Sequence, residues 1–258
     1  MKKIKIGVFD IDGTIFRSSL LIELVRGLVR NGVFPKNASK EMESDYMAWL
    51  NRVGDYDDYL GKVIKIYDKY IIGKKFLKVE AVASSVMELE KDKTYRFTRD
   101  LIFKLKKENY HLIAISGSPS YMVDKFAFHM GFDVSFGAVI GVKDGIFSKY
   151  YVEKNFNTGQ DIFIPMGKRA GVLNFSRKDI LLKKYLDSRN IVVDWGNSVA
   201  VGDSGNDISI LKIVGRPIAF NPDDILIRES IKNKWQIVVE RKNVVYDLKK
   251  FDFIPYKK

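Results

Sequence analysis

The chain has 258 residues, 46% of them hydrophobic, so it is long enough to form one large domain or a core with a second, smaller unit. It contains no cysteine, which excludes disulfides and thiol catalysis, and no apolar run of about 18 residues, which argues against a membrane span. We therefore predict a globular, cytoplasmic protein that does not span a membrane.

The formal net charge is +12, which suits an anionic partner. Lysine and arginine are spread along the chain, in pairs such as Lys74 and Lys75, and form no basic block interleaved with aromatic residues. This pattern favours small anionic molecules over nucleic acid. The two histidines, His111 and His129, lack the spacing of a metal site, so we expect structural roles for both.

The first part of the chain predicts one buried strand followed by helices. Residues 4–9 form a continuous apolar run, which ends at the segment "DIDGT". From Ser18 onward, apolar residues recur at three- and four-residue spacing, and further helical patterns cover 38–52, 56–72 and 75–92. We expect these helices to form an inserted cap, residues 17–95, above the ends of the strands.

After about residue 98 the pattern alternates between helix and strand. We expect helices over 99–109, from Pro119, over 177–188 and over 206–214, with a further helix after "RPIAF". The expected strands are "YHLIAIS", "NSVAVGD", "RPIAF" and "WQIVV", with a hairpin in "AVIGVKDGIFSKYY" that turns at Asp144 and Gly145. Residues 150–175 give no clear pattern. The alternation predicts an α/β fold with a mainly parallel sheet and helices on both faces, built from residues 1–16 and 96–258.

Carboxylates follow two of the predicted strands, and a hydroxyl follows a third. Asp10 and Asp12 come after the first strand, Ser116 ends "YHLIAIS", and Asp203 and Asp207 follow "NSVAVG". A turn explains the Asp-Gly pair taken alone, but parallel strands bring all these side chains to one edge of the sheet. Carboxylates, water and a substrate phosphate are the ligands that suit Mg²⁺.

The segment "ISGSPS" suggests a phosphate-binding turn. Ser118 suits a helix N-cap and Pro119 the first helical position, so backbone N–H groups would point outward toward a phosphate. Ser116 would add a hydroxyl donor. An aspartate nucleophile with a neighbouring carboxyl for proton transfer would then support phosphoryl transfer.

Four separate segments resemble the haloacid dehalogenase superfamily of phosphohydrolases. They are "DIDGT" at 10–14, Ser116 in "ISGSP", a lysine at a helix start, and "GDSGND" at 202–207. The resemblance implies a Rossmann-like three-layer core with an inserted all-helical cap. The cap position and the segment "GDSGNDISILKIVGRPIAFNPD" are similar to the phosphoserine-phosphatase-like branch.

The resemblance also implies roles for the acidic residues. Asp10 would be the nucleophile and Asp12 the general acid and base. Mg²⁺ would be held by the Asp10 side chain, the Asp12 backbone carbonyl and Asp203, with Asp207 supporting the metal from close by.

Ser116 and Gly117 would bind the phosphate, with Asn206 close to it. For the lysine we choose Lys178 in "SRKDILLKKYL", since it stands at the helix start. Arg177, Lys183 and Lys184 are the alternatives.

In one position the chain departs from the phosphoserine phosphatases. The glutamate that they carry seven residues after the second aspartate is Ser19 here, and the nearest acid is Glu23. The resemblance therefore does not imply phosphoserine as the substrate. Arg26, Tyr46 and Trp49 are further candidates for a substrate pocket in the cap.

We expect a Mg²⁺-dependent phosphatase that hydrolyses a small phosphorylated metabolite through an aspartyl-phosphate intermediate. Two alternatives remain open. One is a phosphomutase or phosphotransferase of the same fold, and the other is a non-catalytic, basic nucleic-acid-binding protein.

Overall fold

A computed structural model describes residues 3–154, 161–166 and 177–248. Its main sheet has the strand order β10-β9-β8-β7-β1-β2-β3, and every neighbouring pair is parallel except β9 and β10. The strands are β1 (Ile6–Phe9), β2 (His111–Pro119), β3 (Val134–Ala138), β7 (Val199–Gly202), β8 (Arg216–Phe220), β9 (Gln236–Arg241) and β10 (Val244–Leu248). The mainly parallel sheet that we predicted is confirmed, whereas β3 and β10 were not predicted.

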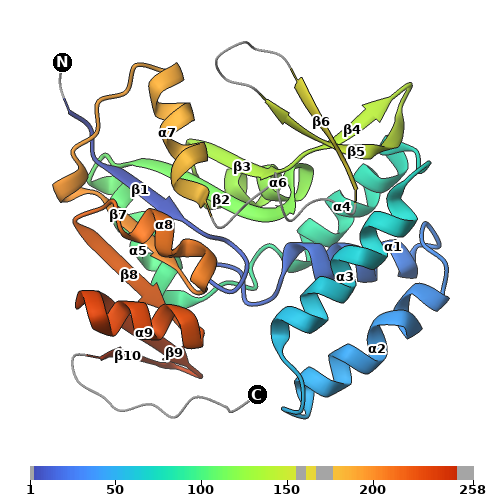
Figure 1. Ribbon diagram of the computed structural model, residues 1–258, viewed down its shortest axis with the longest axis horizontal. Helices are drawn as coiled ribbons and strands as arrows, with labels where there is room; N and C mark the ends of the chain where they lie inside the picture. The colour runs from blue at the N-terminus through green and yellow to red at the C-terminus, as the bar shows by residue number, and fades with distance from the viewer. Residues whose placement is uncertain (1–2, 155–160, 167–176, 249–258) are drawn as a thin grey trace.

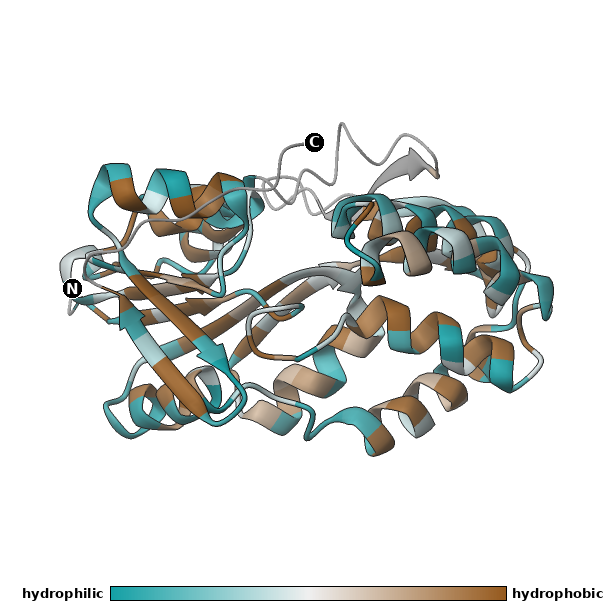
Figure 2. Ribbon diagram, turned by 90° about the horizontal axis from the view of Figure 1, so that it is seen from below, coloured by the Kyte–Doolittle hydropathy of each residue, from teal (hydrophilic) through white to brown (hydrophobic). Residues whose placement is uncertain are grey.

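Helices cover both faces of this sheet, as Figures 1 and 2 show. Ile6 and Val8 of β1 pack in one apolar cluster with α7 (Lys178–Ser188), α8 (Ile208–Leu211) and α9 (Asp224–Asn233). Phe9 belongs to the cluster on the other face, which includes α5 (Arg96–Lys107) and α6 (Ser120–Met130). Successive residues of a strand point to opposite faces, so an apolar run such as β1 is buried on both sides.

Four helices lie between β1 and α5, as the sequence predicted. They are α1 (Leu20–Arg30), α2 (Asn37–Leu50), α3 (Tyr56–Ile71) and α4 (Phe76–Glu90), and we call them the helical insertion. The helix predicted over 206–214 is shorter than expected and consists of a 3-10 turn, Gly205–Asp207, followed by α8. Among the described residues, none of the helices is long and apolar enough to cross a membrane.

The two connections of the insertion to the sheet run side by side. Arg17 N–H donates to the Lys93 carbonyl at 2.8 Å, and Tyr95 N–H donates to the Ile15 carbonyl at 2.8 Å. Phe16 and Thr94 form an antiparallel bridge between them. The insertion therefore begins and ends at one place, next to the loop that follows β1.

A second, three-stranded sheet also contacts the insertion. It consists of β4 (Ile140–Lys143), β5 (Ile146–Lys154) and β6 (Asp161–Pro165), and the predicted hairpin turn at Asp144 and Gly145 is present. Phe147 exchanges backbone hydrogen bonds of 2.9 Å with Gly73 and Lys74, between α3 and α4. Most of residues 150–175, which gave no clear pattern, falls in β5 and β6 or outside the described residues.

Two glycines of the insertion provide a matched test of its packing. A Cβ at Gly27 of α1 would lie 2.4 Å from Val86 Cγ2 of α4, whereas a Cβ at Gly61 of α3 would meet nothing within 4 Å. We predict that Gly27→Ala lowers the free energy of unfolding by about 1–3 kcal/mol through overpacking. Gly61→Ala should raise it by about 0.5–1 kcal/mol, because alanine favours the helix. Denaturant unfolding followed by circular dichroism measures both, and equal effects of the two substitutions would contradict this packing.

Candidate active site

The loop after β1 places Asp10 and Asp12 at the carboxyl end of this strand, which lies between β7 and β2. Asp10 N–H continues the sheet by donating to the Val201 carbonyl of β7 at 3.0 Å. Gly13 has a φ of 81°, which favours glycine, and a Cβ there would lie 2.2 Å from an Asp203 carboxylate oxygen. Glycine is therefore required both for the turn and for the close approach of Asp203.

Asp12 is held by donors from β2 and α1. Its Oδ1 accepts from Leu20 N–H at 2.6 Å, and its Oδ2 accepts from the hydroxyls of Ser116 at 2.6 Å and Ser118 at 2.8 Å. Burial raises the pKa of Asp12, although the donors Ser116, Leu20 and Ser118 oppose the shift. The first helix of the insertion is thus anchored directly on Asp12.

The segment around Ser118 differs from our prediction. We expected Ser118 as an N-cap with Pro119 in the helix, but Pro119 ends β2 and α6 begins at Ser120. The Ser118 hydroxyl donates to Asp12 instead, and it accepts from Leu21 N–H at 3.2 Å. In this structure the Ser116 hydroxyl also donates to Asp12, and its Oγ accepts from Ser118 N–H at 2.9 Å.

Among the described residues, Lys178 is the basic residue that contacts the carboxylates. It is the first residue of α7 and is 3% exposed, and its ammonium group contacts Asp10 Oδ1 and lies 2.6 Å from Asp207 Oδ1. Burial alone would lower the pKa of Lys178, but the charges of Asp10 and Asp207 raise it. Of the alternatives, Arg177 is exposed and pairs with Asp179 at 3.1 Å, and Lys183 is exposed on the same helix.

The turn after β7 positions Asp203 and Asp207. Asp207 Oδ2 accepts from the backbone N–H groups of Asp203 and Ser204 at 3.1 Å, so the carboxylate closes its own turn. The Thr14 hydroxyl donates to Asp203 Oδ1 at 2.8 Å and connects this turn to the loop after β1. Sequence reasoning missed this contact, although Thr14 is part of the "DIDGT" segment.

Asp10, Asp203 and Asp207 together form a compact oxygen cluster. One carboxylate oxygen of each lies within 4.8 Å of the others. Burial raises the pKa of Asp10 to about 7, although Lys178 opposes the shift. Burial and the neighbouring charges of Asp10 and Asp207 raise the pKa of Asp203 well above its usual range.

This donor set fits a divalent cation. Three carboxylates and one ammonium group leave two negative charges uncompensated when all four are ionised, and the cluster offers only oxygen ligands. Mg²⁺ prefers oxygen ligands and would offset those two charges. Asp207 is less free than the other two carboxylates to bind the ion, because both of its oxygens already accept hydrogen bonds.

The remaining candidates lie around this cluster. Gly117 lies in β2 between the two serines that contact Asp12. Asn206 is exposed in the 3-10 turn that ends at Asp207. Glu23 is buried in α1, where it accepts from the Ser18 hydroxyl at 2.8 Å and faces Arg26 at 3.6 Å.

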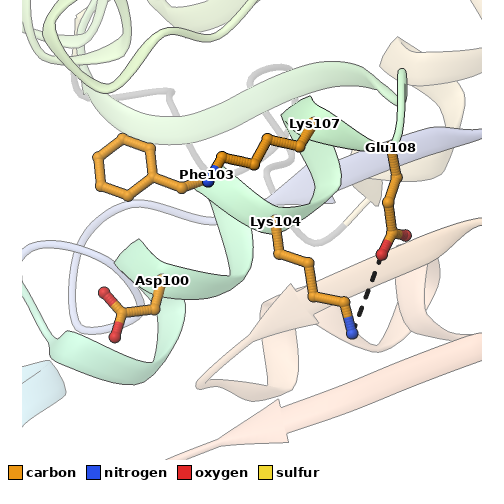
Figure 3. Close-up of a pocket in the computed structure, with 5 residues that line it drawn as sticks. All are labelled: Asp100, Phe103, Lys104, Lys107 and Glu108. Carbon is orange, nitrogen blue, oxygen red and sulfur yellow. Dashed lines mark ion pairs between the residues drawn. The ribbon is translucent and has the colours of Figure 1, made fainter.

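A surface pocket on α5 is separate from the cluster (Figure 3). It has a volume of about 410 Å³, and its two basic and two acidic side chains include a pair, Lys104 and Glu108, at 3.9 Å. The residues that line it are Asp100, Phe103, Lys104, Lys107 and Glu108. Its balanced charge gives no preference for an anion, and none of its residues belongs to the carboxylate cluster.

The chain resembles known proteins over most of its length. Residues 8–212 match the family model of the haloacid dehalogenase-like hydrolases. A curated phosphoserine phosphatase from Methanocaldococcus jannaschii is 26% identical over 243 residues, which cover 94% of this chain and 95% of that protein.

Solved structures share the fold. A Bordetella pertussis protein of unknown function gives a TM-score of 0.66 at 17% identity, covering 92% of this chain and 98% of that one. A phospho-aspartyl intermediate analogue of phosphoserine phosphatase gives 0.55 at 24% identity, covering 93% and 95%. The family model covers well over half of the chain and includes the Asp10 loop, β2, Lys178 and the Asp203 turn. The chain therefore belongs to the haloacid dehalogenase-like hydrolase family, and its curated relatives are phosphatases.

Proposed function

We propose that this enzyme is a Mg²⁺-dependent phosphatase that hydrolyses a small phosphomonoester through an aspartyl-phosphate on Asp10. The observation that carries the proposal is the position of Asp10. Its carboxylate lies at the carboxyl end of β1, in contact with Lys178 and within one oxygen cluster with Asp203 and Asp207. The proposal is supported by this arrangement, because phosphoryl transfer through an aspartate needs a carboxylate nucleophile, a nearby positive charge and a cation.

In the first step, an Asp10 carboxylate oxygen attacks the phosphorus atom and the bond from phosphorus to the ester oxygen breaks. The leaving alkoxide takes a proton from the Asp12 carboxyl and departs as the alcohol. Burial raises the pKa of Asp12, which is the direction that a general acid requires. Lys178 holds the Asp10 carboxylate in place and adds positive charge beside the transferring group.

In the second step, a water molecule attacks the phosphorus atom of the aspartyl-phosphate and passes a proton to Asp12. Inorganic phosphate leaves and the Asp10 carboxylate is restored. A phosphate bound at Ser116 and Gly117 would accept the hydrogen bond that the Ser116 hydroxyl donates to Asp12 in this structure. Substrate binding would thereby remove one of the two hydroxyl donors from Asp12 Oδ2, which favours proton transfer at that oxygen.

A bound Mg²⁺ ion would neutralise charge on the phosphoryl oxygens during both steps. The Asp10 and Asp203 side chains and the Asp12 carbonyl would hold it. Asp207 would position the site from the adjacent turn, because its oxygens bind Lys178 and the turn backbone.

The helical insertion would serve as the cap of this enzyme. Its first helix is fixed to Asp12 through Leu20 N–H, so residues 17–95 begin next to the reacting group. We therefore propose that the insertion selects the alcohol, and that the substrate is a small phosphorylated metabolite of the cytoplasm.

Replacement of the nucleophile tests the proposal most simply. We predict that the wild type releases phosphate from a generic aryl phosphate only with Mg²⁺, and that Asp10→Asn lowers kcat by at least about 10³-fold. Asp187→Asn on the exposed side of α7 is the matched control and should retain full turnover. Full activity of Asp10→Asn, or no turnover by the wild type on a broad panel of phosphomonoesters, would overturn the proposal.

Metal binding has a readout that does not depend on activity. We predict that Mg²⁺ at about 100 times its Kd raises the free energy of unfolding of the wild type by about 2.7 kcal/mol. Asp203→Asn should abolish this Mg²⁺-induced shift, whereas Asp187→Asn should keep it. Thermal unfolding with and without Mg²⁺ after EDTA treatment measures the effect, and an unchanged shift in Asp203→Asn would contradict the assignment.

A further inference from the structure

An aromatic cluster, consisting of Tyr46, Trp49, Tyr56 and Tyr59, joins α2 to α3. Trp49 stacks on Tyr59 at 5.9 Å with an interplanar angle of 10°, and it meets Tyr56 edge to face at 5.4 Å. Tyr46 lies 5.4 Å from Tyr59. Tyr59 is buried, but the other three rings are only partly buried, so the cluster retains accessible aromatic surface.

Two residues at the start of α3, Tyr56 and Asp57, interact electrostatically with acidic groups of the core. Burial raises the pKa of Tyr56, and the charges of Asp12 and Asp203 raise it further, so its hydroxyl is neutral and lies within electrostatic reach of both. The next residue, Asp57, acts in the same way on Asp223, whose carboxylate binds the turn of Gly205 at 2.9 Å. These electrostatic interactions accord with the contact that Tyr59 of the same helix makes with Arg26 of α1, the helix whose first N–H donates to Asp12.

Arg26 extends the cluster toward α1. One guanidinium nitrogen lies 3.4 Å from the Tyr59 hydroxyl, and the guanidinium lies over the Tyr46 ring at 5.4 Å. The Arg26 side chain is 38% exposed. It stands six residues after Leu20, which donates to Asp12, and this spacing corresponds to about 9 Å along the helix. Arg26 therefore stands beyond the part of α1 that contacts Asp12, where the leaving group and not the phosphate would extend.

Glu23, the acidic residue next to Arg26, already contacts other side chains. Glu23 accepts from the Ser18 hydroxyl at 2.8 Å and faces the positive charges of Arg26 at 3.6 Å and Lys93 at 3.9 Å. A ligand ammonium group would have to compete with both cations for this carboxylate. The surroundings of Arg26 therefore favour a ring over the amino group of an amino acid.

We propose that Tyr56, Trp49 and Arg26 bind the leaving group of the substrate, and that this leaving group carries an aromatic ring and no ammonium group. The inference rests on the proposed phosphatase function and specifies its substrate class. Trp49 already stacks on Tyr59 and has the Arg52 guanidinium over its ring at 6.0 Å. Tyr56 and the edge of Trp49 would therefore contact the ring of the leaving group. The Arg26 guanidinium would contact the face of that ring or a substituent on it.

Two phosphomonoesters with closely similar leaving oxygens isolate the effect of the ring. Benzyl phosphate and ethyl phosphate both release a primary alcohol, so their chemical steps are comparable, and O-phosphoserine adds the ammonium group. We expect the wild type to prefer benzyl over ethyl phosphate in kcat/KM by about tenfold or more. O-phosphoserine should be no better than ethyl phosphate.

The variants then locate the preference. Tyr56→Leu should lower the benzyl-to-ethyl ratio about five- to tenfold, mainly through KM, whereas Tyr56→Phe keeps the ring and should keep the ratio within about twofold. Arg26→Gln should lower the ratio about threefold. Phe128→Leu, at an aromatic residue that is 86% exposed on α6, and Arg30→Gln, at an exposed position of α1, are the controls and should leave both substrates unchanged.

The outcomes separate this inference from the proposed function. Turnover that requires Asp10 but shows no preference for benzyl phosphate, or a preference that Tyr56→Leu leaves intact, would overturn the inference alone. A fall in kcat/KM that is equal for both substrates in Tyr56→Leu, with a lowered melting temperature, would show that the cluster only packs α2 on α3. Absence of Asp10-dependent turnover on any of the three substrates would overturn the proposed function itself.

Discussion

The contact of Lys178 with Asp10 and Asp207 is the interaction on which the site depends. Three carboxylates lie within one small, largely buried cluster, where their mutual repulsion is weakly screened. Among the residues that the structure describes, the buried ammonium group of Lys178 offsets part of this repulsion, while burial and the neighbouring carboxylate charges raise the pKa of Asp10 and of Asp203. A cluster with this residual negative charge favours the binding of a cation.

The backbone around the cluster leaves space for the carboxylates to lie close together. Gly13 has no side chain where Asp203 approaches, and Gly202 has none where Asp207 folds back, since a Cβ there would lie 2.3 Å from the Asp207 side chain. Asp12 is held in turn by donors from β2 and from the start of α1. Sheet, insertion and carboxylates are therefore one connected structure, and the position of the insertion depends on a residue of the site.

Much of the core could be predicted from the sequence. The apolar run before "DIDGT" and the later alternation of helix and strand led to the parallel sheet and to the helical insertion, both of which the structure contains. The strands β3 and β10 were missed, because β3 is short and contains glycine, and β10 is exposed and has a polar residue within it. The attachment of the second sheet to the α3–α4 connection depends on backbone pairing between distant segments, which local patterns do not encode.

The site was predicted less completely than the fold. The spacing of Asp10, Asp12, Asp203 and Asp207 pointed to one edge of the sheet, where all four lie. The lysine could not be chosen with the same certainty, because Lys178, Lys183 and Lys184 share one helix and only the packing of α7 shows which of them is buried. The Ser118 hydroxyl was expected at a helix end but donates to Asp12, since the direction of a hydroxyl depends on its neighbours in space. The contact of Ser116 with a phosphate stays a prediction, and in this structure its hydroxyl also donates to Asp12.

The central claim is that Asp10 carries the phosphoryl group. Rapid acid quenching during turnover of a phosphate-labelled substrate, followed by peptide mapping, would trap the covalent intermediate and locate the label. The account predicts label on the peptide that contains Asp10, with amounts that rise to a steady level before product accumulates. Label on another residue, or rapid turnover without any labelled protein, would contradict it.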